Sequence, residues 1–206
     1  MERIENAVAL MGVVASETID IDNIYGQPYE GWATTVETER RSGIADEAIV
    51  VMPKATDVSQ MQIGTPVMVI GKMQTFKDFT TGKVLVYVLA EYAAPVEGEH
   101  WENQNDVTLT GKLGRGITYR ETPKGKRITD VMVIVPNVIK GNSCYIPCIC
   151  WQQAADEVKD WEEGTEVVLT GRLHSREYTK RVDDETTEQR TCYEVSVNTI
   201  EKLSEV

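Results

Sequence analysis

The sequence has 206 residues, and its 33 Asp and Glu against 21 Lys and Arg give a formal net charge of −12 at pH 7. This charge excludes a surface that attracts polyanions everywhere, because phosphate binding needs local clusters of lysine and arginine. No apolar stretch approaches the roughly 20 residues of a membrane-spanning helix, which excludes a transmembrane anchor of that kind.

The pattern that opens the chain occurs a second time in its other half. Residues 6–12 and 105–111 share the frame Asn-x-Val-x-Leu-x-Gly, and residues 64–72 and 164–172 share Gly-Thr-x-Val-x-x-x-Gly followed by a basic residue. Further along, we align Val86 with Val195. Copies that keep their register over this length indicate two folded domains and not a short-period solenoid. We expect these domains at residues 1–96 and 103–206, joined by an acidic linker.

The first copy is strand-rich and acidic. Residues 1–102 hold 7 basic against 16 acidic side chains, and a weak helix is expected around residues 57–61. Arg40 and Arg41 could contact phosphates, but carboxylates surround them in the sequence. A solvated turn at the end of a strand is therefore the favoured interpretation of that segment.

The second copy shows the order of its elements most clearly. Short β-branched or alternating runs predict strands around residues 107–109, 128–135, 145–151, 166–170 and 193–200. Between the third and fourth run, residues 152–161 predict a helix with Ala154, Ala155, Val158 and Trp161 on one face, and Gly164 follows as its stop. Three strands, a helix and two strands are the order of the OB-fold, a five-stranded, partly open Greek-key barrel. We therefore predict an all-β protein of two tandem OB-fold barrels with one short helix per domain.

Basic residues gather in the second copy, where residues 112–140 hold seven Lys and Arg against two carboxylates. Two long polar segments, residues 115–127 and 180–190, are expected to join strands one and two and strands four and five. On OB-folds these loops reach around oligonucleotides. The local positive charge therefore coincides with the first of these two loops.

Alternate side chains of a strand share a face, so Tyr145 and Trp151 are expected to point away from Cys144, Cys148 and Cys150. The next strand brings Arg172, His174, Arg176 and Tyr178 to one face by the same rule. Aromatic rings stack on bases at about 1–3 kcal/mol each, while cations follow the phosphates. The alternative is an ordinary barrel with one aromatic-rich face. The candidate nucleic-acid contacts are Arg115, Tyr119, Arg120, Lys124, Lys126, Arg127, Tyr145, Trp151, Arg172, Arg176, Tyr178, Lys180 and Arg181.

No catalytic or metal site is expected. The cysteines lack a paired C-x-x-C, and cysteines on one face of a strand typically pack as small apolar side chains. His100 and His174 have no partner at a catalytic spacing, so we expect no enzyme activity and no cofactor. The absence of a signal peptide and the cysteine pattern predict a reduced, cytoplasmic protein.

The second copy resembles the bacterial single-stranded DNA-binding protein family. The resemblance lies in residues 105–111, 119–126, 145–151, 171–178 and 193–197. It implies binding of single-stranded DNA without strong sequence preference, in DNA replication, recombination or repair. It also implies base-stacking aromatics at Tyr145, Trp151 and Tyr178, and basic contacts at Arg115, Arg172 and Arg176. The first copy is similar to a diverged member of the two-domain type found in low-GC Gram-positive bacteria, and the four-domain habit of the family implies a homodimer.

Two departures from the family support an alternative function. The acidic C-terminal tip through which the family recruits replication and repair proteins is absent from residues 202–206, and Pro147 stands where relatives often carry a basic residue. The alternative is a primosome-type accessory or protein-interaction scaffold built on OB-folds. The overall acidity favours this scaffold, whereas the coincidence of basic and aromatic residues in one copy favours binding of single-stranded DNA.

Overall fold

The computed structural model describes residues 6–24, 27–77, 84–98, 100–139, 141–181 and 186–203. The first half contains β1 (Asn6–Val14), β2 (Ile19–Ile24), β3 (Gln27–Glu39), β4 (Ala45–Pro53), β5 (Pro66–Lys77) and β6 (Val84–Pro95). The second half contains β7 (Gln104–Leu113), β8 (Thr118–Glu121), β9 (Arg127–Pro136), β10 (Ser143–Trp151), α1 (Gln153–Val158), β11 (Glu166–Arg181) and β12 (Thr187–Lys202). The prediction of a nearly all-β chain is confirmed.

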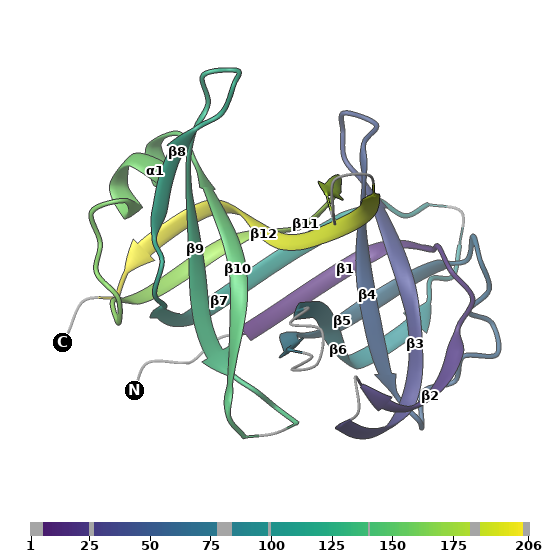
Figure 1. Ribbon diagram of the computed structural model, residues 1–206. Helices are drawn as coiled ribbons and strands as arrows, with labels where there is room; N and C mark the ends of the chain where they lie inside the picture. The colour runs from purple at the N-terminus through teal and green to yellow at the C-terminus, as the bar shows by residue number, and fades with distance from the viewer. Residues whose placement is uncertain are drawn as a thin grey trace.

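The strands form two barrels that share one sheet, in the order β2-β3-β4-β6-β5-β1-β7-β11-β12-β10-β9-β8 (Figure 1). Each barrel closes where its first strand also pairs with its third, β1 with β3 and β7 with β9. At these crossings a Cβ on Gly12 would lie 2.1 Å from the Glu37 carbonyl oxygen, and one on Gly111 would lie 2.4 Å from that of Ile134. The repeated glycine is therefore required by the close approach of two backbones.

The two barrels meet along β1 and β7 in an arrangement close to two-fold symmetry. Asn6 lies opposite Leu109, and Leu10 lies opposite Asn105 in an antiparallel ladder. The Asn6 amide donates to the Met73 carbonyl (2.9 Å) and accepts from the Met73 N–H (2.8 Å). Asn105 makes the same pair of bonds with Leu173, at 2.9 and 2.8 Å. The asparagine that opens each copy thus adds side-chain hydrogen bonds between a central strand and its neighbour, β1 with β5 and β7 with β11.

Three expectations are corrected by the structure. Residues 57–61 form turns and no helix, because the Asp57 carboxylate accepts the Ser59 N–H (3.0 Å) and competes with helical hydrogen bonding. The helix of the second copy, α1, is shorter than the residues 152–161 expected. The parallel pairs Val50 with Val88 and Cys148 with Val195 show that Val88, and not Val86, corresponds to Val195.

The segment over residues 115–127, expected as a loop, contains the short strand β8. Thr118 and Arg120 lie opposite Asp130 and Ile128 on β9, and residues 122–126 form the tight turn of a hairpin. Gly125 has a φ of 73°, which glycine adopts without strain and which the turn uses. Because this segment is a paired hairpin, each of its basic side chains points to a defined side of the sheet.

Candidate nucleic-acid interface

Strand register brings many of the predicted residues to one side of the second barrel, which we call the outer face. Ile149 on β10 lies opposite Asp130 on β9 and Ser196 on β12, and Ser196 lies opposite Arg172 on β11. Directly paired residues point to the same side of a sheet. The outer face therefore carries Arg120, Asp130, Tyr145, Pro147, Trp151, Arg172, His174, Arg176, Tyr178, Lys180 and Glu194.

The aromatic rings of the outer face differ in exposure. Tyr145 and Tyr178 are 51% and 38% exposed, which leaves ring surface open for stacking. Trp151 is half-buried, and its Nε1 donates to the Ser196 hydroxyl at 3.1 Å. The Arg176 guanidinium lies 5.9 Å from the centre of the Tyr178 ring, within the range of a cation–π contact. The arrangement offers a ring and a guanidinium side by side, as base stacking next to a phosphate requires.

The cysteines of β10 face the core, as predicted. Cys144, Cys148 and Cys150 are at most 2% exposed. Burial, together with the charge of Asp130, raises the pKa of the Cys150 thiol to about 12, which disfavours the thiolate that binds metals. Within the described part of the chain, no cluster of three His, Cys, Asp or Glu side chains could hold a metal ion.

Carboxylates neutralise much of the positive charge on the outer face. Arg120 donates through Nε to Asp130 at 2.7 Å, and Arg176 Nε lies 3.5 Å from Glu194. His174 Nδ1 lies 3.3 Å from the same Glu194 carboxylate. Burial alone would raise the pKa of Glu194, but His174 and Arg176 outweigh it and hold that pKa below its usual value. A phosphate on this face must therefore compete with Asp130 and Glu194 for the arginines.

Arg172 is held by the first barrel. Its Nη1 lies 2.5 Å from Oδ2 of Asp46 on β4. The Asp46 side chain is 1% exposed, and it also accepts from Arg40 Nε (2.6 Å) and from the Ser175 N–H (3.1 Å). Arg40 and Arg172, both candidate phosphate contacts in the sequence, thus pair with Asp46. Because Arg172 belongs to the second barrel and Asp46 to the first, these ion pairs, called the Asp46 clasp below, link the two barrels.

Sequence reasoning missed Asp46, although a signal was present. Along β4 the even-numbered positions 46, 48, 50 and 52 are buried, so Asp46 occupies a core position of an alternating strand. A carboxylate at such a position needs a cation or strong hydrogen-bond donors. The alternation indicates this need, but only the structure identifies the partners.

The other candidate residues lie at the edges of the outer face or on the opposite side of the sheet. The Tyr119 hydroxyl (3.2 Å) and Arg127 Nη2 (3.1 Å) both contact Asp156 of α1, on the opposite side of the β8–β9 sheet. Arg115 pairs with Glu163 at 3.2 Å in the loop before β11. Lys124 and Lys126 are exposed on the β8–β9 hairpin, and Lys180 and Arg181 are exposed at the end of β11. In Figure 1 the β8–β9 hairpin projects from the top of the second barrel, and the end of β11 and the start of β12 reach across toward β4.

The equivalent face of the first barrel is apolar and closed. Where the second barrel has Arg120, Asp130, Arg176 and Glu194, the matching strand pairs of the first barrel place Ile21, Ala33, Phe76 and Tyr87. Phe76 and Tyr87 are 8% and 3% exposed and form a hydrophobic cluster with Ile24 and Val51. Ile139, from the second barrel, also packs against this cluster. The two barrels share a fold but not a surface.

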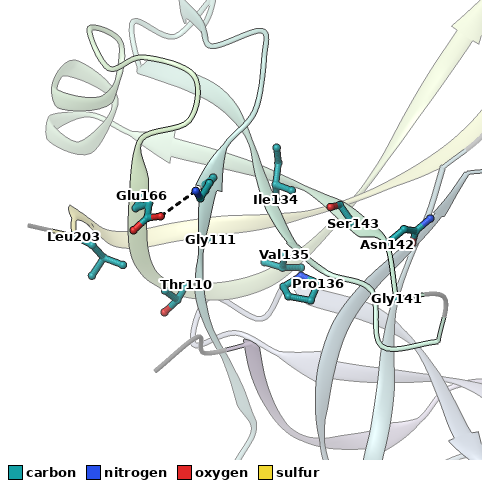
Figure 2. A pocket seen from close by; sticks show the side chains of 11 residues that line it. Thr110, Gly111, Ile134, Val135, Pro136, Gly141, Asn142, Ser143, Glu166 and Leu203 are labelled. Carbon is teal, nitrogen blue, oxygen red and sulfur yellow. Dashed lines mark ion pairs between the residues drawn. The ribbon is translucent and has the colours of Figure 1, made fainter. Parts of the chain in front are cut away.

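An apolar hollow of about 460 Å³ lies outside this interface, where β7, β9 and the start of β11 meet (Figure 2). Ile134, Pro136 and Leu203 supply much of its apolar lining. Its charged residues, Lys112 and Glu166, form an ion pair of 3.1 Å with one another. This hollow therefore leaves no unpaired charge for a phosphate. No helix in the described segments is long and apolar enough to cross a membrane.

Comparison with known proteins bears on the fold and on the family of the second domain. No curated protein sequence matches the chain. Wild-type single-stranded DNA-binding protein from Thermus aquaticus superposes with a TM-score of 0.75 at 18% identity, covering 100% of this chain and 96% of that one. A deletion mutant of the same Thermus protein gives 0.74 at 20% identity, covering 100% and 98%. Residues 104–203 match the model of the single-strand binding protein family. The chain thus has the fold of these Thermus proteins, and its second domain matches the single-strand binding protein family.

Proposed function

We propose that the protein binds single-stranded DNA without strong sequence preference, mainly through the outer face of its second barrel, in replication, recombination or repair. The observation that carries the proposal is the alignment of Tyr145, Trp151 and Tyr178 with arginines on one sheet face. Proteins of this family bind DNA and catalyse no reaction, so we assign neither an enzyme activity nor a cofactor.

The proposed strand path runs over the outer face between the β8–β9 hairpin and the end of β11. Tyr145, Trp151 and Tyr178 would stack on bases, while Arg120 and Arg176 would exchange their carboxylate partners for phosphates. Lys124 and Lys126, and Lys180 with Arg181, would hold the strand from either side of the face. In this proposal Tyr119, Arg115 and Arg127 lie outside the path of the DNA strand. Arg172 is assigned to the ion pair with Asp46.

Salt dependence tests the proposal directly. If several of these cations contact phosphates, log K for oligo(dT) should fall with log salt by about 0.7 per contact. Fluorescence titration at several salt concentrations measures this slope. A slope near zero, or no binding at low salt by folded protein, would contradict the proposal. It would favour a protein-interaction scaffold, which the acidity of the first domain supports.

We also propose a homodimer, in which the exposed side of the shared sheet is the contact. Ile70 on β5 and Tyr92 on β6 lie opposite each other on that sheet and are 43% and 53% exposed. Burial of such a pair favours association. Light scattering at micromolar concentration should report twice the 23.1 kDa mass of the chain, and Tyr92→Glu should shift it toward one chain mass. A monomer in the wild type would contradict the dimer without affecting the proposed DNA interface.

The proposal places the protein in the cytoplasm. All four cysteines are free, and the three on β10 are buried in the core. Free thiols persist in a reducing compartment.

A further inference from the structure

The seam between the barrels contains a hollow of about 280 Å³ beside the Asp46 clasp. The β3–β4 hairpin of the first barrel supplies Arg40, Arg41 and Glu39 to its wall, and the second barrel supplies Arg172. Asn103, at the end of the linker, also lines it and accepts the Glu39 N–H through Oδ1 at 3.0 Å. Segments far apart in the sequence thus build one concave site.

The hollow carries excess positive charge in a chain that is acidic overall. Its three arginines face two carboxylates, Glu39 and the buried Asp46, which leaves a formal charge of +1. By contrast, a hollow at the end of β4 is lined by Asp57 and Glu91 without a lysine or arginine. Burial lowers the pKa of Arg172, Asp46 raises it and Arg40 lowers it again, with a net value below the ordinary one for arginine. The crowding of cations at this seam is therefore only partly relieved by Asp46.

Donors remain available in the hollow for an anion. Arg41 is exposed and has no ion-pair partner among the described residues. Arg172 contacts Asp46 through Nη1 and also lines the hollow. A guanidinium presents several N–H donors in one plane, which suits the oxygens of a phosphate.

The hollow adjoins the outer face of the second barrel. Arg172 lies directly opposite Ser196, whose hydroxyl accepts the Trp151 indole N–H. Arg172 therefore lies both in the wall of the hollow and on the outer face. We infer that a phosphodiester of the bound strand occupies this hollow, with Arg41 of the first barrel as its principal ligand. This inference rests on the proposed function, and it makes the DNA site a composite of both domains.

Replacing Arg41 by alanine tests the inference in the full-length chain. With an oligo(dT) longer than about 16 nucleotides, so that it extends past one OB-fold, the salt slope should fall in magnitude by about 0.7. The ratio of variant affinity to wild-type affinity should therefore be about fivefold lower at about 0.1 M salt than at about 1 M. Arg41→Lys should keep most of the slope, because the charge remains.

Lys54→Ala is the matched control. It also removes one exposed positive charge from the first barrel, but at the other end of β4, where Lys54 pairs with Asp20. Its salt slope should equal that of the wild type. Asn103→Asp keeps the acceptor for the Glu39 N–H, adds a negative charge to the hollow and should weaken binding.

The outcomes separate the two proposals. If the wild type fails to bind, the proposed function fails. If the wild type binds but Arg41→Ala and Asn103→Asp match the Lys54→Ala control, the composite site is wrong while the function stands.

Discussion

Replacing Asp46 by alanine is expected to lower the free energy of unfolding by about 3–5 kcal/mol, the usual cost of removing one partner from a buried ion pair. The Asp46 side chain is 1% exposed and serves two guanidinium groups, of Arg40 and Arg172, and the Ser175 N–H. Alanine would leave these donors partly buried without an acceptor. Because Arg172 and Ser175 belong to the other barrel, the loss should appear as weaker cooperation between the two domains.

Urea unfolding followed by tryptophan fluorescence measures this effect. Asp20→Ala is the control, since Asp20 is 62% exposed and its pair with Lys54 should contribute at most about 1 kcal/mol. Asp46→Asn, which keeps the shape and one acceptor, should fall between the two. Equal midpoints for Asp46→Ala and Asp20→Ala would show that the clasp contributes nothing beyond a surface pair.

Among the described residues, the Asp46 ion pairs have no copy at the symmetry-related end of the seam. There, Cys144 stands in the place of Asp46, and its Sγ accepts the Thr75 N–H at 3.3 Å as Asp46 accepts that of Ser175. Ser175 Oγ accepts the Glu47 N–H, and Thr75 Oγ1 accepts that of Tyr145. The backbone contacts are conserved between the two ends while the charge is present at only one. A buried thiol needs no counterion, so the Cys144 end requires no arginine.

Local patterns in the sequence could predict the fold and the composition of the outer face. The alternation along β10 separates Tyr145 and Trp151 from the buried cysteines, and the repeated Gly12 and Gly111 mark the places where each barrel closes. Both follow from the period of two residues in a strand and from backbone sterics. These rules act between near neighbours, which explains why they can be applied without a structure.

Contacts between distant segments could not be predicted in this way. Arg172 resembles a phosphate ligand in sequence because its partner, Asp46, lies in the other domain. Tyr119 belongs to a basic, aromatic segment, yet β8 turns its hydroxyl toward Asp156 and away from the outer face. The apolar cluster of Phe76 and Tyr87 likewise becomes visible only when the strand registers of the two barrels are compared.

The position of the rings on the sheet gives the last prediction, which concerns DNA affinity. Tyr145→Ala and Tyr178→Ala should each weaken oligo(dT) binding by about 1–3 kcal/mol, the usual contribution of one stacked base. Tyr119→Ala is the matched control. The exposed fraction of Tyr119, 41%, is similar to those of Tyr145 and Tyr178, but Tyr119 lies on the helix side of the sheet. Its removal should leave the affinity nearly unchanged, and thermal melting should show that all three variants are folded. If Tyr119→Ala costs as much as Tyr145→Ala, the strand passes over the helix side of the barrel, and the outer face is not the binding surface.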